Sequence, residues 1–307
     1  MRAKRLLCLL LALAMLALCG CGGQQPASGK PRIVVTVYPV WDWVRCILDE
    51  QAAKVELALL LNDGVDMHSY QPTVADMAKI AACDLLIYVG GESDEWIDDV
   101  EPTNPNQRRV SLLELMGDAA LEEELREGMR GESGGAADEH VWLSLKSAVC
   151  LCTALLPYLR ELGLDARYLD AAAAAYTAKL KALDEEYQTV VDGAARRTLL
   201  FADRFPFRYL VEDYDLDYYA AFAGCEAETE ASFRTVAFLA RKLDELQLPC
   251  VLVIESGDGK LARTVIESSA DPTRPVLTLH SMQGASGGRS YLEIMEENLM
   301  VLKEALN

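Results

Sequence analysis

The sequence predicts an α/β protein of two lobes, each a mostly parallel sheet flanked by helices, joined by one long backbone helix. After residue 30 the chain alternates between short runs of aliphatic and β-branched residues and stretches with helical periodicity, which is typical of βαβ units. This alternation occurs twice, before and after a long uninterrupted helical segment. Two such sets favour two α/β lobes, each with its own layer of helices.

The N-terminal segment, residues 1–20, is predicted to be a lipoprotein signal peptide. Three basic residues precede an apolar run from Leu6 to Leu18, which is too short to cross a bilayer comfortably. The following Leu18-Cys19-Gly20-Cys21 resembles the lipobox of bacterial lipoproteins, which are cleaved before the Cys and acylated on its sulfur. Cys21 is therefore the predicted lipid attachment site. A plain secretory signal or an uncleaved anchor is the alternative, and each of these also predicts export.

The composition of the remaining chain suits an exported protein that attracts cations. Residues 21–30 are rich in Gly, Gln, Pro and Ser and predict a flexible tether. Removing the three basic residues of the signal, which has no acidic ones, takes the formal charge from −19 to −22. This balance argues against a nucleic-acid partner, and solubility alone is the alternative role of most of the carboxylates. Residues 31–165 are the expected N-terminal lobe, 166–193 the linking helix and 194–307 the C-terminal lobe.

The strands and helices of both lobes follow from the apolar pattern. In the first lobe the expected strands are 33–37, 55–60, 84–89 and 109–113, with helices at 38–50 and 73–82. In the second lobe the expected strands are 198–202, 218–222, 251–255 and 276–279. The acidic, Gly-rich segment 121–139 is expected to be a solvated, mobile insertion. Besides the acylated Cys21, six cysteines remain in the mature chain, and their disulfide state stays open: Cys46, Cys83, Cys150, Cys152, Cys225 and Cys250.

The segment 167–191 predicts a single helix between the two sets of strands. Apolar residues step by three and four along one face from Leu169 to Val190, and no Pro or Gly interrupts them. About 25 residues at 1.5 Å each give a helix roughly 37 Å long. Such a helix can tie two lobes together, and a long helix packed within one domain is the alternative.

The chain contains only three histidines, and they are the candidate metal ligands. His68 follows a predicted strand and a short loop, His280 ends a predicted strand, and His140 begins a helical stretch after a loop. Asp203 follows the predicted strand 198–202, and ligands of open α/β sheets bind at the carboxyl ends of strands. Two or three imidazoles with one carboxylate suit Zn(II), whereas Mn(II) prefers more oxygen ligands. The fourth ligand is left open between Asp203, a Glu of segment 226–230 and water.

Two segments resemble the solute-binding lipoproteins of zinc and manganese ABC importers, the zinc-uptake cluster A-I family. The stretch Gly64-Val65-Asp66-Met67-His68-Ser69-Tyr70-Gln71-Pro72-Thr73, with residues 82–96 after it, is similar to the segment that bears the family's first ligand His. Asp138-Glu139-His140-Val141-Trp142-Leu143 is similar to the second ligand segment. The resemblance covers essentially the whole mature chain and implies two α/β lobes joined by one long helix.

Two later segments depart from the family pattern. The stretch 201–210, which contains the sequence DRFPFRY, resembles the region where the family has its third ligand His, but Arg204 falls at that position. Arg is cationic and has no free lone pair, so Asp203 beside it is the candidate ligand instead. The family's fourth ligand, commonly an Asp at the end of a late strand, falls on His280.

The resemblance implies a binding protein, expected to be a monomer, that captures a divalent transition metal and delivers it to an ABC permease driven by an ATPase. It would be held on the outer side of the cell membrane by its lipid anchor. Zinc is expected, with manganese as the alternative. A zinc-dependent hydrolase or lyase is a further alternative, because three imidazoles and an open position can activate water. No HExxH motif or nucleophile signature accompanies them, so an enzyme is not expected.

Overall fold

The computed structural model describes residues 29–61, 65–131, 135–224, 231–284 and 288–307. The predicted signal peptide, most of the tether and the lipid attachment residue Cys21 lie outside the described residues. Residues Pro31–Asn307 form one compact unit. In the part of this unit that the structure describes, no helix combines the length and apolar character needed to cross a membrane.

The first lobe is built on a parallel sheet in the order β2-β1-β3-β4. Its strands are β1 (Arg32–Val35), β2 (Glu56–Leu59), β3 (Leu85–Tyr88) and β4 (Arg108–Ser111). Val34 of β1 lies opposite Ala58 on one side and Leu86 on the other. The two central strands are almost wholly buried, which explains their continuous apolar runs.

Short helices connect these strands and bring polar side chains to the sheet edge. They are α2 (Tyr38–Leu48), η1 (Asp49–Lys54), η2 (Met67–Ser69), α3 (Val74–Ala82), η3 (Glu92–Asp99), α4 (Leu112–Met116) and η4 (Gly117–Ala119). Thr73 and Asp76 form a capping box at the start of α3, so the sequence fixes where this helix begins. The η2 turn follows β2 and carries His68.

The second lobe repeats the arrangement with a parallel sheet in the order β6-β5-β7-β8. Its strands are β5 (Thr198–Phe205), β6 (Asp217–Ala223), β7 (Val251–Val253) and β8 (Val276–Thr278), and its helices are α8 (Arg208–Asp213), α9 (Phe233–Glu245), α10 (Lys260–Glu267) and α11 (Tyr291–Ala305). Strand β5 is longer than the sequence predicted. It continues past Ala202, after a register shift between Phe201 and Arg204, so Asp203 and Arg204 lie inside it.

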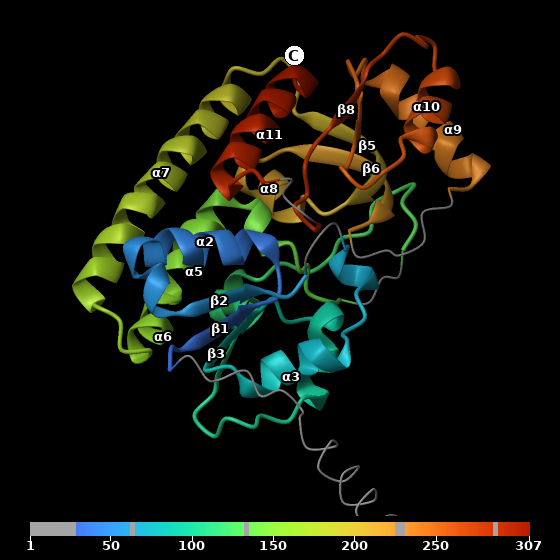
Figure 1. The fold of residues 1–307 in the computed structure, drawn as a ribbon. Helices are drawn as coiled ribbons and strands as arrows, with labels where there is room; N and C mark the ends of the chain where they lie inside the picture. Colours follow the sequence, from blue (N-terminus) through green and yellow to red (C-terminus); the bar gives the residue numbers. More distant parts are fainter. Residues whose placement is uncertain (1–28, 62–64, 132–134, 225–230, 285–287) are drawn as a thin grey trace, which may run out of the picture. The chain divides into compact units, whose positions relative to one another are not determined.

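The long helix predicted between the lobes is α7 (Ala166–Asp192), with 27 residues. The Asp165 side chain accepts hydrogen bonds from the backbone N–H groups of Arg167 and Tyr168 and so fixes its start. Helix α7 packs against α2, α5 (Leu145–Ala154) and α6 (Leu156–Glu161), and also against α11 of the second lobe (Figure 1). It therefore links the two lobes, and the predicted fold class is confirmed.

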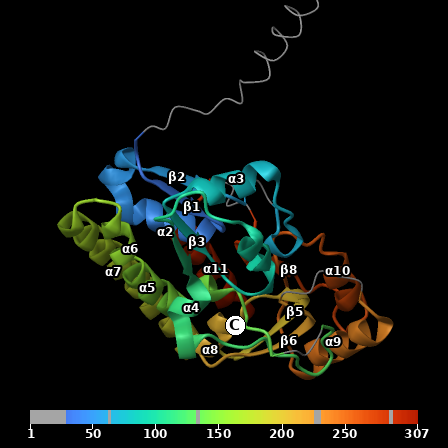
Figure 2. The same cartoon turned by 90° about the horizontal axis from the view of Figure 1, so that it is seen from below.

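Two apolar cores stabilise this unit. The larger core contains side chains from both sheets and from α7, including Val34, Leu86, Leu180 and Phe201. The smaller core lies between the second sheet and helices α9 and α10, which flank β5 and β6 (Figure 2). The larger core continues from one lobe into the other, so the lobes are packed together by their apolar interior as well as by α7.

The segment between β4 and α5 is solvated as its composition suggested, since its described residues from Leu121 to Ala137 are half-buried or exposed, but it is also held by backbone pairing. Residues Glu122 and Ala137 form an antiparallel bridge, and Arg130 pairs with β6 of the second lobe. The Arg130 N–H donates to the carbonyl of Ala221 at 2.9 Å, and the Ala223 N–H donates to the carbonyl of Arg130 at 2.9 Å. The described part of this segment thus lies on the second lobe, although it precedes α7 in the sequence.

The cysteines in the described part of the chain are all free. They are Cys46, Cys83, Cys150, Cys152 and Cys250, while Cys225 lies outside the described residues. Burial raises the pKa of the Cys83 thiol to about 12 and that of Cys46 to about 11. These thiols are protonated at neutral pH, as expected of small apolar core residues.

Candidate metal site

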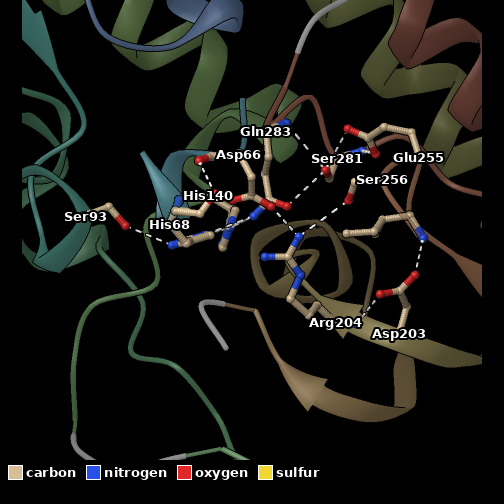
Figure 3. A network of polar contacts seen from close by, with 12 residues as sticks. Asp66, His68, Ser93, His140, Asp203, Arg204, Glu255, Ser256, Ser281 and Gln283 are labelled. Carbon is tan, nitrogen blue, oxygen red and sulfur yellow. Dashed lines mark hydrogen bonds and ion pairs between the residues drawn. The ribbon is translucent and has the colours of Figure 1, made fainter. Parts of the chain in front are cut away.

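The side chains of His68 and His140 meet, with their Nε2 atoms 3.1 Å apart (Figure 3). His68 lies in η2, where Asp66 caps the turn by accepting the His68 backbone N–H at 3.0 Å. His140 stands just before the single turn η5 (Val141–Leu143). The two imidazoles come from segments 72 residues apart, so their meeting is a product of the tertiary fold.

The first imidazole is held in a neutral state by its surroundings. Nδ1 of His68 lies 2.8 Å from Oγ of Ser93 and 3.8 Å from Oε2 of Glu139. Burial, together with the charge of nearby His140, lowers the pKa of His68 to about 3. Glu139 accepts the Ser93 backbone N–H at 2.8 Å, and burial raises the pKa of its carboxyl to about 7. His68 therefore keeps a free lone pair for a cation over the physiological pH range.

The second imidazole is oriented by a carboxylate. Oδ1 of Asp138 accepts both the backbone N–H of His140 at 2.9 Å and its Nδ1–H at 3.0 Å. Because Nδ1 carries the proton, the Nε2 lone pair faces His68. Burial alone lowers the pKa of His140, but the charge and hydrogen bond of Asp138 outweigh it and raise this pKa above 6.5. A carboxylate behind an imidazole is the common support of metal-binding His residues.

Contacts with the second lobe fix the segment that carries His140. The indole N–H of Trp142 donates to the carbonyl of Ser281 at 2.8 Å, and the Tyr291 hydroxyl donates to the carbonyl of Trp142 at 2.6 Å. The Tyr209 hydroxyl donates to the carbonyl of Asp138 at 3.0 Å. All three partners follow α7 in the sequence, so the position of His140 is set by the second lobe.

A third side chain at this point is Gln283, which sequence reasoning missed. Its Nε2 lies 3.0 Å from Nε2 of His68 and 2.5 Å from Nε2 of His140. Gln283 is 4% exposed and comes from the loop after β8, three residues beyond His280. The sequence signal for Gln283 was its position shortly after a predicted parallel strand, because ligands were expected at the carboxyl ends of these strands.

His280 lies in the same loop but makes other contacts. Its backbone is held by Asn298, which accepts the His280 N–H at 2.7 Å and donates to its carbonyl at 2.8 Å. Its Nδ1 accepts the Met282 N–H at 3.2 Å and lies 3.3 Å from Oε1 of Glu255. Burial lowers the pKa of the His280 imidazole. The ring is thus engaged on Nδ1 by groups of its own lobe.

Asp203 and Arg204 point in different directions from β5. The Asp203 carboxylate accepts the backbone N–H groups of Arg204 at 2.9 Å and Ile254 at 3.2 Å, and burial raises its pKa. Arg204 forms an ion pair with Asp66, and its Nη2 lies 3.5 Å from Oγ of Ser256. Figure 3 shows the guanidinium beside the two imidazoles and the Asp203 carboxylate turned away from them.

Of the four predicted ligands, then, the structure brings together His68 and His140. Across the described ranges, no group of three or more His, Cys, Asp or Glu side chains is arranged to hold a metal ion. The alternative Glu ligands of segment 226–230 lie outside the described residues. The nitrogen atoms that converge here are those of two imidazoles, a ligand type that suits a transition metal such as zinc better than an oxygen-preferring ion.

Two parallel α/β sheets linked by one long helix, with imidazoles from separate segments meeting beside them, define a two-lobed solute-binding protein. The model of the family ZnuA, described as zinc-uptake complex component A, periplasmic, matches residues 33–305. The chain therefore belongs to this family, and the resemblance inferred from the two His-containing segments is confirmed.

Named relatives and a solved structure agree with this assignment. The chain is 29% identical to the zinc-binding lipoprotein AdcA of Streptococcus pneumoniae over 98% of this chain and 61% of AdcA. It is 26% identical to the high-affinity zinc uptake system protein ZnuA of Bacillus subtilis, over 93% of this chain and 90% of ZnuA. The fold is similar to that of a Zn(II)-bound AdcAII variant of Streptococcus pneumoniae, with a TM-score of 0.76, 21% identity and coverage of 92% and 100%. The chain thus spans about 61% of the length of the AdcA relative.

Proposed function

We propose that this protein captures a divalent transition metal, zinc in the first place, outside the cytoplasm and delivers it to an ABC importer. The observation that carries the proposal is the 3.1 Å approach of the His68 and His140 Nε2 atoms, each backed by a hydrogen bond on Nδ1. Two imidazoles oriented in this way offer converging lone pairs to one cation. The similarity to the zinc-binding lipoprotein AdcA and to the zinc uptake system protein ZnuA supports zinc as the cargo.

His68 and His140 are the proposed primary ligands, and His280 and Asp203 remain the other predicted ligands. In the structure Nδ1 of His280 lies beside Glu255, and the Asp203 carboxylate accepts the backbone N–H groups of Arg204 and Ile254, so we infer that both side chains would have to move to join the two imidazoles at one ion. These movements belong to closure around the metal, in which cargo binding stabilises one arrangement of the lobes.

The partners and the location follow from the same proposal. A permease and its ATPase would receive the metal, and a lipid on Cys21 would hold the protein at the outer face of the cell membrane as a monomer. A nitrogen-rich pair favours zinc over manganese, which remains the alternative cargo. A hydrolase or lyase is not supported, because the matched family is a component of a zinc-uptake complex.

Calorimetric titration of metal-free residues 22–307 tests the proposal. We expect one tight zinc site, weaker manganese binding, and loss of the site when His68 and His140 are both changed to Ala. Single His280→Ala and Asp203→Ala variants then measure how much each of these two side chains contributes to zinc affinity. A zinc site that is unchanged in the His68/His140 double variant, with circular dichroism confirming the fold, would remove both residues from the ligand set.

A further inference from the structure

Arg204 places a cation next to the two imidazoles that are proposed above to bind the metal. Its charge lowers the pKa of His68, and Figure 3 shows its guanidinium beside His68 and His140. We propose that a small carboxylate-type anion, such as hydrogencarbonate, binds together with the metal, with one oxygen on the ion and another on the Arg204 guanidinium. The cargo is then a metal–anion pair rather than a bare ion, an inference that rests on the proposed capture function.

The Arg204 guanidinium has a hydrogen-bond donor that its protein neighbours do not use. The residue is 7% exposed, its Nη2 pairs with Oδ2 of Asp66, and the same Nη2 lies 3.5 Å from Oγ of Ser256. Its Nε–H is buried and has no hydrogen-bond partner among the residues that the structure describes. A buried donor without an acceptor is unfavourable. A carboxylate is the acceptor that a guanidinium fits best, because two parallel N–H groups can meet two oxygens.

The described carboxylates around Arg204 are engaged elsewhere. One oxygen of Asp66 accepts the His68 backbone N–H at 3.0 Å, and the other pairs with Nη2 of Arg204. The Asp203 carboxylate is turned away from the imidazoles and accepts two backbone N–H groups. Both oxygens of Glu255 accept hydrogen bonds from one serine, at 2.7 and 2.9 Å. An anion from solution is therefore the acceptor that we assign to the Arg204 Nε–H.

The charges at the site favour an anion once a metal is present. Neutral imidazoles leave the full charge of a divalent ion in place, next to the Arg204 cation. Asp66 balances Arg204, and Asp138 lies behind one imidazole. Burial raises the pKa of Glu139 to about 7, so this carboxyl is only partly ionised at neutral pH. The positive excess is costly in buried surroundings. An anion that touches both the metal and the guanidinium removes it.

Burial at the site favours an anion of few atoms. His140 is 0% exposed and the His68 side chain 4%, so both imidazoles lie away from solvent. Beside the guanidinium, by contrast, the Asp66 side chain is 20% exposed and Ser256 is exposed. This side of Arg204 gives a small solute an approach. The shared chemistry is a planar pair of oxygens, which inorganic hydrogencarbonate and a small organic monocarboxylate both supply.

Zinc titrations of the wild type with and without added anion test the proposal. Metal-free residues 22–307 are titrated in buffer freed of carbon dioxide, and then with hydrogencarbonate, acetate or chloride at equal ionic strength. We expect hydrogencarbonate to tighten zinc binding by roughly 5- to 150-fold and chloride to leave it unchanged. A similar gain with acetate would extend the ligand to organic monocarboxylates. Both carboxylate-type anions also complex free zinc, which weakens apparent binding, so a gain in affinity reports a complex of protein, metal and anion.

The same titrations separate this inference from the capture function. Tight zinc binding that neither hydrogencarbonate nor acetate strengthens would overturn the anion and leave the capture function standing. If the wild type binds no zinc in any of these buffers, both fail.

An Arg204→Gln variant tests whether the guanidinium holds the anion, with Arg108→Gln as the control. Arg108 pairs with Glu161 at the surface, and its side chain is 60% exposed. We expect Arg204→Gln to lose the gain in zinc affinity that the anion gives, and Arg108→Gln to keep it. Circular dichroism checks the fold. If Arg204→Gln does not fold, Arg204→Lys replaces it, because Lys keeps the charge beside Asp66 without the paired N–H groups. Here too the gain should shrink, and a full gain in the folded variant would overturn the role of Arg204.

A spectroscopic readout separates anion binding from a merely structural role of Arg204. With hydrogencarbonate labelled with carbon-13, the zinc-loaded wild type should show a carbon signal of bound anion that is absent without zinc. This signal should persist in Arg108→Gln and disappear in Arg204→Gln. A bound signal that is unchanged in Arg204→Gln would overturn the assignment of the anion to Arg204.

Discussion

Asp66 and Arg204 form an ion pair that joins the capping residue of the His68 turn to strand β5 of the second lobe. The Asp66 and Arg204 side chains are 20% and 9% exposed, respectively. Burial alone raises the pKa of Asp66, but the hydrogen bond and charge of Arg204 outweigh it and lower this pKa. The position that the family resemblance assigned to a ligand His thus carries a cation whose charge is met by the residue two places before His68.

Replacing Asp66 by Asn should reduce both stability and zinc affinity. The Asn carbonyl can still accept the His68 N–H, but Arg204 loses its counter-charge and keeps a buried, poorly paired guanidinium. We expect a loss of about 1–3 kcal/mol in the free energy of unfolding and weaker zinc binding, because Arg204 then repels the ion. Urea unfolding and calorimetry measure the two effects. Asp99→Asn, at an exposed position, is the control, and equal values for the two variants would contradict the role of the pair.

Zinc binding near pH 6 should release about one proton, because only one of the two imidazoles is charged there. The pKa of His68 is about 3, so His68 is already neutral, whereas the pKa of His140 is raised above 6.5 by Asp138 in spite of its burial. As the pH falls through the raised pKa of His140, a proton competes with the metal, and affinity should fall about tenfold per pH unit. Titrations in buffers of different ionisation enthalpy count the protons. Release of two protons would show that His68 is charged as well.

Asp94 should make the protein lose stability as the pH rises from 4 to 7. Its carboxylate accepts the Val89 and Gly90 N–H groups at 2.7 and 3.2 Å, yet burial raises its pKa from 3.8 to about 6. A raised carboxyl pKa stabilises the fold fully below pH 3.8, and this stabilisation is lost as the pH rises through 6. The wild type should therefore lose about 2–3 kcal/mol between pH 4 and 7 that Asp94→Asn does not lose. Urea unfolding at several pH values compares them, and parallel curves would refute the assignment.

Gly224 should be needed for the position of His140. A Cβ at residue 224 would lie 2.8 Å from the carbonyl oxygen of Phe205 and 3.2 Å from Cε1 of His140. Gly224→Ala should push the imidazole away from His68, weakening zinc binding and costing about 1–3 kcal/mol of stability. Gly193→Ala is the control, because its Cβ would meet its nearest neighbour, the Thr189 carbonyl, at an ordinary 3.5 Å. Equal zinc affinity in the two variants would contradict this role.

The fold could be predicted because its signals are local. Apolar runs marked the buried parallel strands, and an unbroken helical periodicity marked α7, which extends one residue beyond the predicted segment at each end. The end of β5 was missed because Asp203 and Arg204 are polar. The backbone N–H of Ile254 satisfies Asp203 within the second lobe, and the carboxylate of Asp66, from the first lobe, satisfies Arg204. Both partners are remote in sequence.

The site was predictable only where a residue type is distinctive. Histidine is rare in this chain, so His68 and His140 were found, and the structure brings them together. Gln283 could not be singled out, because an amide has no distinctive pattern and its contacts depend on how the loop after β8 packs. For the same reason the Glu255 neighbour of His280 was not foreseen.

The support of His140 by the second lobe has a consequence for dividing the polypeptide. A chain cut just before α7 would yield a first piece that contains both His68 and His140 but lacks β6, Tyr209 and Ser281, which hold the segment around His140. That piece would contain both imidazoles but would lack the contacts that orient His140 toward His68. The unit that must be inherited, expressed or transplanted intact is therefore the pair of lobes together, and the boundary between them along the sequence is not the boundary of the site.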